Sequence, residues 1–600
     1  MRIVLVNWAH LWDGASYGGG VNGYCQALAL DLVRRGHDVV SLCSGVTYTP
    51  GPESGAPGAP EMRRHDDWLG VRVFEVINSP VLAPSLLQFA DPAGETSCPE
   101  LEQIVRQLFL LLRPEIVHFH NIEGFSAGCV DAARAPAGDW PGARVLYSLH
   151  NYHTICPQVY LMQGHTRPCF DSEGGLLCAG CIERTEPREE MVRRARRYAA
   201  EYRKTHPAAQ PAPPPPGRPS VTHELVSEVK RFVRGRPARP APPPPPPPEP
   251  IEPPGSPVAA PDDALLPRPI EPDAERRGQA KSITAKERNG FVPRPEDPDW
   301  LPLLNVIRPE PGCGQAGANS YGRRRGAMVA MLNRCDRVLA VSGFVRDKFV
   351  SMGVEPGRIA ALPIGSRINE VVGVNRELVF APEPFASAPR RPVRLVFLGY
   401  NNYYKGLHVL ADALELLTPE HLRRLSLTVH AHQGQSMQWR FERLRPRLAD
   451  LTYQYAYDYS DIPWILGGKD LVVVPSVWWD NAPQTVFEAF GCGVPVLGAE
   501  LGGIPDFVQH GQNGLLFRGN DRYDLARRLA EIVRNPHTLD GLRENVRAPK
   551  SIAEHGGEVE NLYRSLLARG PVPGETPDQP PPSCAAAPPT DAGATVGARH

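Results

Sequence analysis

Short apolar segments alternate with segments of helical periodicity along the first part of the chain. The strand-like segments are residues 2–7, 37–43, 71–77, 115–120 and 144–149, and helical spacing is found at 21–35 and about 100–112. Apolar strands that are separated by helices are typical of a parallel sheet covered by helices on both faces. The pattern therefore predicts an α/β domain of the doubly wound, Rossmann-like kind.

The same alternation returns after a long interruption. Strand-like segments at 336–342 and 358–364 continue the first domain, and a second series follows at 393–398, 425–431, 451–455, 471–475, 494–498 and 515–518. Its helices are expected at about 406–417, 484–491 and 522–534, with a last helix near 554–569. We predict two Rossmann-like domains that face each other across a cleft, since α/β sheets bind ligands at the carboxyl ends of their strands.

Proline divides the chain into folded and unfolded parts. Of the 67 prolines, 27 fall in residues 207–300 and 8 in residues 571–600. Such composition favours extended polyproline conformations and disorder, although 222–234 has the pattern of a short helix. The predicted boundaries are 1–205 and 318–370 for the first domain, 206–317 for a Pro-rich insertion, 371–392 for a linker, 393–570 for the second domain with the final helix, and 571–600 for a tail. Docking of a proline-recognising partner is the alternative role of the insertion.

Charge and hydropathy exclude some classes of protein. The 65 basic and 66 acidic residues give a net charge of −1, which argues against a protein built to bind nucleic acid. No apolar window reaches the length of a membrane-spanning helix, and residues 1–7 have the pattern of a strand and not of a signal peptide. We therefore expect a cytoplasmic protein. A basic stretch at 193–204 leaves open a peripheral contact with the inner face of the membrane, against the alternative of a solvated helix face.

A glycine run follows the first strand and opens a helix. Gly18, Gly19 and Gly20 let the backbone approach a ligand closely, and the helix start offers unpaired N–H groups to an anion. The alternative is a flexible turn. The GxGxxG spacing of dinucleotide-binding sites is absent, which argues against nicotinamide chemistry.

The second domain carries the most informative segment. Lys405 follows its first strand, where an ammonium group can neutralise a phosphate. Asp480 lies in the loop after the strand that ends at residue 475, and Glu488 lies eight residues later on a helix. Both carboxylates can face the cleft and accept hydrogen bonds from a ligand rich in hydroxyl groups. The alternatives are a solvated lysine and helix-capping acids.

Residues 475–496 resemble the acid-x7-acid signature of retaining glycosyltransferases, with Asp480 and Glu488 on its acidic positions. Further matches are 397–406, 470–476, 502–506, 511–517, the glycine run, 117–120 and 148–150. Several ordered motifs at the right spacings, over roughly 450 residues, are together similar to glycosyltransferase family 4, which has the GT-B fold.

The resemblance implies a nucleotide-diphosphate-sugar donor, with UDP or GDP, held mainly by the second domain. Glu488 would bind the ribose and Asp480 a sugar hydroxyl, while Lys405, Gly399 and the glycine run would lie near the phosphates. His150 would lie beside the transferred sugar. The implied enzyme is a retaining hexosyltransferase of EC class 2.4, acting on a glycan, lipid-linked or other glycoconjugate acceptor. It needs no catalytic metal, because cationic side chains and helix N-termini can stabilise the leaving group.

Two departures from the family pattern keep other functions open. The family commonly has glutamate where Asp480 stands, and arginine where Tyr400 stands. A scaffold on a catalytically weakened frame, which recruits partners through its proline runs, is therefore the alternative function. A glycogen- or sucrose-type synthase is a third, although no residue singles out a glucan acceptor.

Histidines near the ends of the fourth and fifth strands, and cysteines after the fifth, are further candidates. His118, His120 and His153 are acceptor-side candidates, against the alternative of packed structural histidines. Four thiols, Cys156, Cys169, Cys178 and Cys181, have the ligand count of a tetrahedral zinc site. Disulfides or unlinked thiols are the alternatives. A similar loop in some members of the resembled family implies a structural device that shapes the acceptor side.

Overall fold

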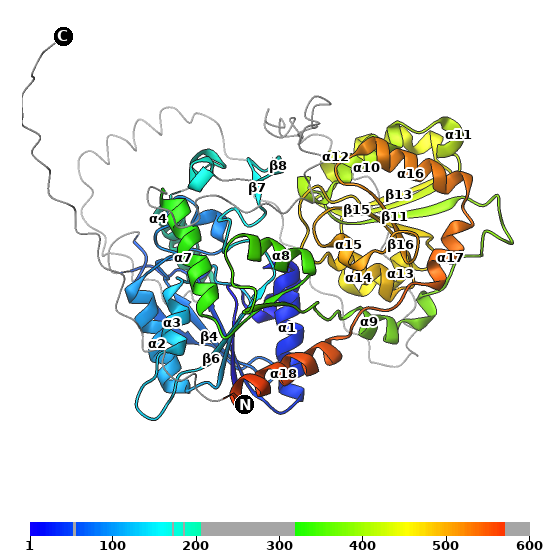
Figure 1. Ribbon diagram of the computed structural model, residues 1–600. Coiled ribbons are helices and arrows are strands. Elements are labelled where there is room, and N and C mark those ends of the chain that lie inside the picture. Colours follow the sequence, from blue (N-terminus) through cyan, green and yellow to red (C-terminus); the bar gives the residue numbers. More distant parts are fainter. Residues whose placement is uncertain (52–55, 171–172, 184–185, 206–318, 570–600) are drawn as a thin grey trace, which may run out of the picture.

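The computed structural model describes residues 1–51, 56–170, 173–183, 186–205 and 319–569. These residues form two α/β domains that lie side by side, each built on its own sheet (Figure 1). The predicted Pro-rich insertion, the helix predicted within it and the C-terminal tail lie outside the described residues. Two Rossmann-like domains, as the periodicity predicted, are confirmed.

The first sheet has eight strands in the order β10-β9-β6-β5-β1-β2-β4-β3. Every neighbouring pair is parallel except β3 and β4. The sequence pattern did not predict β3, because three of its four residues, EMRR, are charged and the strand lies at the edge of the sheet. The strands are β1 (Arg2–Val6), β2 (Asp38–Ser44), β3 (Glu61–Arg64), β4 (Arg72–Ile77), β5 (Ile116–Phe119), β6 (Arg144–Leu149), β9 (Arg337–Ala340) and β10 (Ile359–Ala361).

Helices of the first domain include several that the sequence analysis did not predict, among them α7. The helices are α1 (Gly19–Arg34), α2 (Pro99–Leu112), α3 (Gly128–Arg134), α4 (Pro187–Thr205), α7 (Ser320–Arg334) and α8 (Gly343–Ser351). Helix α7 begins where the Asn319 side chain accepts hydrogen bonds from two backbone N–H groups. Its apolar face was hard to recognise because Arg324 and Arg325 lie on the buried side.

The second sheet has six parallel strands in the order β13-β12-β11-β14-β15-β16. Its order turns at β11 and β14, whose carboxyl ends therefore open a crevice for a ligand. The strands are β11 (Val393–Tyr400), β12 (Leu425–His432), β13 (Asp450–Gln454), β14 (Leu471–Val474), β15 (Val496–Glu500) and β16 (Gly514–Arg518), and the longer helices are α10 (Leu407–Glu415), α12 (Gln435–Leu444), α14 (Gln484–Gly491) and α16 (Arg522–Arg534).

The last helix, α18 (Ile552–Ala568), corrects our domain assignment. We expected it with the second domain, but it packs on α1 of the first domain (Figure 1). The Tyr24 hydroxyl lies 2.7 Å from His555 Nε2, and the Tyr563 hydroxyl lies 2.7 Å from His118 Nδ1. An amphipathic pattern reveals that a helix buries one face, but not which domain receives it.

The predicted linker is partly helical. Helix α9 (Ile368–Val374) covers its start and packs on α14, where Gly491 leaves room for the Ile368 side chain. In the part of the chain that the structure describes, no helix combines the length and apolar character needed to cross a membrane.

Candidate functional site

The carboxyl ends of the two sheets meet around one site. The Asn481 side chain donates a hydrogen bond of 2.7 Å to the His150 carbonyl oxygen. The Tyr152 hydroxyl donates one of 2.9 Å to the Trp479 carbonyl oxygen. These bonds join the segment after β6 to the loop after β14, and so bring two sequence-predicted site residues, His150 and Asp480, to the same place.

Lys405 and Asp480 form an ion pair at the carboxyl edge of the second sheet. Lys405 Nζ lies 2.9 Å from Asp480 Oδ2, and the Ser476 hydroxyl donates a bond of 3.2 Å to the same oxygen. The lysine side chain is 31% exposed and the aspartate side chain 6%, so the ammonium group is the accessible partner. A cation that can be reached by a ligand, held beside a carboxylate, is suited to offset the charge of a diphosphate.

Local backbone geometry fixes this pair. Lys405 ends a short 3-10 helix, Tyr403–Lys405, which is capped by the Asn402 side chain. Gly406 follows with φ 71°, and a Cβ there would overlap the Pro475 carbonyl oxygen. Only glycine therefore allows the start of α10 to lie against the end of β14.

The Asp480 loop is held by two further glycines. The Gly503 N–H donates a bond of 2.7 Å to the Asp480 carbonyl oxygen. A Cβ at Gly502, where φ is 60°, would come 2.6 Å from the Asp480 nitrogen. These close contacts explain why the segment after β15 carries paired glycines.

Glu488 lies on α14 with its side chain buried. Burial raises the pKa of its carboxyl group from 4.5 to about 7, and the positive charge of Lys405 partly opposes this shift. Burial and the charge of Glu488 raise the pKa of Tyr457, which places that phenol in the same environment. Near neutral pH this carboxyl group can therefore donate or accept a hydrogen bond.

The glycine run faces the second domain. Gly18 and Gly19 have φ values of 91° and 64°, and α1 begins at Gly19. A Cβ at Gly18 would lie 2.8 Å from Ala9 Cβ, whereas one at Gly20 would lie 3.6 Å from Gln484 Cγ, at the start of α14. The loop thus lies between the two sheets, where its backbone N–H groups can reach an anion.

His150 follows β6 directly and is half-buried. Its ring lies 4.8 Å from the Tyr24 ring, and its Nε2 lies 3.3 Å from His120 Nδ1. Burial lowers the pKa of His150 to about 3, with a smaller contribution from His555. The imidazole is therefore neutral at pH 7 and suited to hydrogen bonding with a sugar hydroxyl.

Two of the other candidate histidines have structural partners. His118 is fully buried between the hydroxyl groups of Ser148 and Tyr563. His153 Nε2 lies 2.6 Å from Glu95 Oε1. His120 alone of the three contacts His150, through the 3.3 Å approach of their ring nitrogens.

One of the two positions that depart from the family pattern, Tyr400, lies at the end of β11, next to Gly399. Gly399 has φ 152°, and a Cβ there would meet only the Phe397 ring, at 3.8 Å. Tyr400 is 43% exposed, and its ring lies 4.9 Å from the His432 ring. An aromatic surface thus stands where the family commonly has a cation.

An aromatic cluster beside the ion pair escaped the sequence analysis. The rings of Tyr160 and Tyr404 stack at 4.2 Å, and Trp478 meets Tyr160 edge-on at 5.0 Å. Trp478 Nε1 is buried without a hydrogen-bond partner among the described residues. Ser476 was missed as well, although its position four residues before Asp480 is a usable signal. Tyr160 carries no such signal, because it lies far away along the chain.

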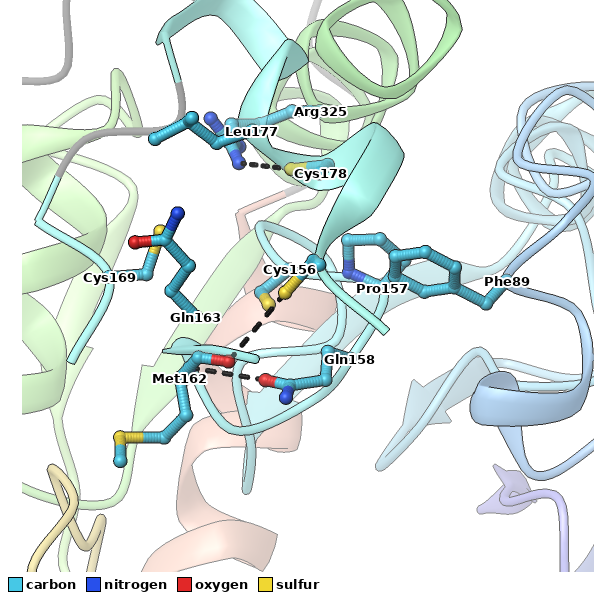
Figure 2. Close-up of a pocket in the computed structure, with 11 residues that line it drawn as sticks. Phe89, Cys156, Pro157, Gln158, Met162, Gln163, Cys169, Leu177, Cys178 and Arg325 are labelled. Atoms are coloured by element: carbon cyan, nitrogen blue, oxygen red, sulfur yellow. Dashed lines mark hydrogen bonds between the residues drawn. The ribbon is translucent and has the colours of Figure 1, made fainter. Parts of the chain in front are cut away.

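The four cysteines of the predicted zinc site line one pocket, together with Phe89 and Arg325 (Figure 2). They do not converge on a point. Thiolates bound to one zinc ion lie about 3.8 Å apart, as Zn–S bonds of roughly 2.3 Å require. Among the described residues, no three donor atoms of these cysteines lie within 4.8 Å of one another. The cysteines are gathered as expected, but their arrangement does not fit a tetrahedral zinc site.

Both domains match known protein families. Residues 19–203 match the "Glycosyl transferase 4-like domain", and residues 392–535 match "Glycosyl transferases group 1". The first match contains Gly19 and Gly20 of the glycine run and His150, and the second contains Lys405, Asp480 and Glu488. The segments that approach one another at the site therefore come from both matched domains.

The chain is also similar to individual proteins. It is 27% identical over 258 residues to the putative colanic acid biosynthesis glycosyltransferase WcaL of Salmonella typhimurium, covering 40% of this chain and 57% of the relative. It is 28% identical over 225 residues to D-inositol 3-phosphate glycosyltransferase 2 of Catenulispora acidiphila, covering 36% and 52%. The chain thus spans somewhat more than half the length of these relatives.

Solved structures of similar proteins include the sucrose-phosphate synthase of Thermosynechococcus elongatus, with a TM-score of 0.48, 13% identity and coverage of 95% of this chain and 100% of that one. HepE of Anabaena in complex with UDP-glucose has a TM-score of 0.44, 13% identity and coverage of 94% and 100%. Each of the two domains therefore matches a family of glycosyltransferases and is built on a doubly wound parallel sheet. Together the two domains have the architecture of the GT-B fold.

Proposed function

We propose that the chain transfers a sugar from a nucleotide-diphosphate-sugar donor to a glycan, lipid-linked or other glycoconjugate acceptor, with retention of configuration. The donor would lie at the carboxyl edge of the second sheet, and the acceptor on the side of the first domain. Lys405 would offset the diphosphate charge, Glu488 would bind the ribose and Asp480 a hydroxyl of the sugar. Gly399 and the glycine run would approach the phosphates.

The observation that carries this proposal is the grouping around Lys405. Its ammonium group lies 2.9 Å from Asp480, and its charge partly opposes the rise in the pKa of Glu488 that burial causes, so one cation acts on two carboxyl groups. The three residues come from the ends of β11 and β14 and from α14. A nucleotide-sugar donor has a charged diphosphate with a hydroxyl-bearing group on either side. The single cation suits the diphosphate, and the two carboxyl groups suit the hydroxyls.

In the proposed reaction, the bond between the anomeric carbon and the diphosphate oxygen breaks, and the acceptor oxygen bonds to the same face of that carbon. The acceptor proton goes to the leaving phosphate oxygen. Neutral His150 would donate a hydrogen bond to the sugar and hold it in place. Lys405 and the N–H groups at the start of α1 would stabilise the charge on the leaving group.

The relatives support the class of reaction and leave the substrates open. WcaL is described by its biosynthesis of colanic acid, the Catenulispora relative by D-inositol 3-phosphate, and HepE was solved with UDP-glucose. We propose UDP or GDP as the nucleotide. A contact of the basic α4 with a membrane surface would suit a lipid-linked acceptor, since Arg193 on that helix is 63% exposed.

Calorimetry with UDP-, GDP- and ADP-sugars tests the donor site first. We expect one nucleotide to bind selectively, and Lys405→Ala and Glu488→Ala each to weaken binding by about 10- to 100-fold, since hydrogen bonds to charged groups are worth about 1.5–3 kcal/mol. Arg527→Ala is the matched control, because Arg527 pairs with acids on α16 away from the site. The anomeric configuration of the product, read by NMR, tests retention.

A folded chain that binds no donor would contradict the proposal and would leave the scaffold function. Deletion of residues 207–300 separates the two further. An enzyme of the proposed kind keeps donor binding after this deletion. A scaffold loses partner binding after the deletion and keeps it in the Glu488→Ala variant.

A further inference from the structure

A second group of donor side chains lies in the first domain, apart from the sugar site. His10 lies in the loop between β1 and α1, Cys43 on β2 and Glu75 on β4. One ligand atom of each, a ring nitrogen, the thiol sulfur and a carboxylate oxygen, all lie within 4.8 Å of one another. Among the described residues, no other group of three or more such side chains converges this closely.

The sheet register builds this group. Cys43 and Glu75 are direct partners in the parallel pairing of β2 and β4, so their side chains leave the same face of the sheet. Both side chains are fully buried. A carboxylate buried beside a thiol is costly unless cations or hydrogen-bond donors compensate its charge.

The approach of His10 to Glu75 differs from an ordinary hydrogen bond. His10 Nε2 lies 3.0 Å from Glu75 Oε2. Nevertheless, this buried nitrogen makes no hydrogen bond of acceptable direction to any described residue. Two ligand atoms of a tetrahedral zinc ion lie about 3.3 Å apart without pointing at each other, because Zn–N and Zn–O bonds are roughly 2.0–2.2 Å long.

Neighbouring groups orient two of the three side chains, Glu75 and His10. His65 Nε2 lies 2.9 Å from Glu75 Oε2, and the Thr47 N–H donates a bond of 3.2 Å to Glu75 Oε1. The Trp12 ring stacks on the His10 ring at 4.5 Å and covers it from solvent. Hydrogen bonds to a ligating carboxylate and an apolar cover are the usual surroundings of a metal site.

We propose that His10, Cys43 and Glu75 bind a zinc ion, with His65 holding the Glu75 carboxylate in place. Binding would release the thiol proton of Cys43, since the thiolate is the ligand form. Nitrogen, sulfur and oxygen donors together suit zinc better than calcium or magnesium, which prefer oxygen alone. The ion would fix the loop that leads from β1 to the glycine run.

This loop is already tied to α1. The Asn22 side chain donates hydrogen bonds to the carbonyl oxygens of His10, Gly14 and Tyr17, at 2.8, 2.8 and 3.0 Å. Zinc at His10 would join the same loop to β2 and β4. The ion would therefore order the approach to Gly18.

The test uses the full chain without a histidine tag, freed of metal by a chelator and then titrated with Zn2+ alone or Co2+ alone. We expect one ion per chain and, with Co2+, the absorption of a cobalt–thiolate bond. Cys43→Ala should abolish that absorption, and His10→Gln should abolish tight binding. His65→Ala should weaken binding by about 10- to 100-fold, as for other residues that orient a ligand.

The four-cysteine loop supplies the matched control. Cys156→Ser with Cys178→Ser should leave both the stoichiometry and the cobalt spectrum unchanged. Cys43 is buried, so the Cys43→Ala variant can fail to fold. His10 is partly exposed, and the His10→Gln variant then still tests the proposal. A chain that binds no zinc, that binds it equally well in His10→Gln, or that loses it only in the loop variant would overturn the proposal.

Discussion

At the scale of single residues, the charged groups that suit the site for binding also cost stability where they are buried. Glu488 is buried beside one cation, and its carboxyl group titrates near neutral pH in the folded chain. Asp480 is compensated by the Lys405 ammonium group and the Ser476 hydroxyl. The two acids of the signature thus differ in electrostatic environment, although the sequence motif presents them alike.

The raised pKa of Glu488 has a measurable consequence for stability. A carboxyl group whose pKa is 4.5 when unfolded and about 7 when folded destabilises the fold above pH 4.5, and the full cost, about 3 kcal/mol, is reached above pH 7. Glu488→Gln should therefore raise the free energy of unfolding at pH 8 and leave it nearly unchanged at pH 4, while donor binding weakens. Denaturant unfolding at both pH values checks this prediction. Equal effects at the two pH values would contradict it.

Two adjacent glycines make a matched pair of substitutions. Gly18→Ala combines a positive φ with a clash at Ala9 Cβ, whereas a Cβ at Gly19 meets nothing within 4 Å. Both should cost about 1–2 kcal/mol from the left-handed backbone, and Gly18→Ala should cost more because of the clash. Thermal unfolding of the two variants measures the difference. A less stable Gly19→Ala would refute the steric explanation.

At the scale of elements, α7 is anchored by a buried network of charges. Arg324 Nε lies 2.5 Å from Glu95 Oε2, and His153 shares the other oxygen of this carboxylate. Arg324 and Glu95 are both fully buried. The helix that follows the insertion is therefore fixed to the segment before α2 by charge as well as by apolar packing.

Removing one partner from this network should be severe. Glu95→Gln leaves the Arg324 guanidinium buried without its counter-charge, which costs about 3–5 kcal/mol for comparable pairs. Arg334→Gln is the control, because Arg334 lies on the same helix in an exposed pair with Asp131. Urea unfolding curves of the two variants compare the costs. A Glu95→Gln variant as stable as the control would show that the network contributes little.

At the scale of the whole molecule, α18 returns to the first domain after the chain has completed the second. Its His555 and Tyr563 meet Tyr24 and His118. Burial lowers the pKa of His118, and lowers that of His555 to about 4. The chain therefore joins its two domains twice, and the second connection is lined by histidines that must stay neutral.

Acid should loosen this connection. Histidines whose folded pKa is below 6.5 contribute stability that is present above pH 6.5 and is lost as the pH falls toward about 4. His555→Gln should lower stability at pH 7.5 but flatten its decline between pH 6.5 and 4.5. Hydrogen exchange of α18 at pH 6.5 and at pH 4.5, in the unmodified chain and in the variant, checks this expectation. An unchanged pH profile in the variant would assign the decline to other groups.

Local patterns in the sequence were enough to predict many of the strands and helices and the residues of the acidic motif. Alternating apolar runs are local, so strands such as β1 and β6 could be predicted within a residue or two, together with the acidic pair on the loop and helix after β14. The tertiary structure decided what lies together. It placed α18 on the first domain, set Tyr160 beside Trp478, kept any three of the four loop sulfurs from converging and paired Cys43 with Glu75. These contacts join residues far apart in the chain, and periodicity carries no information about such pairs because it reports only which face of an element is buried.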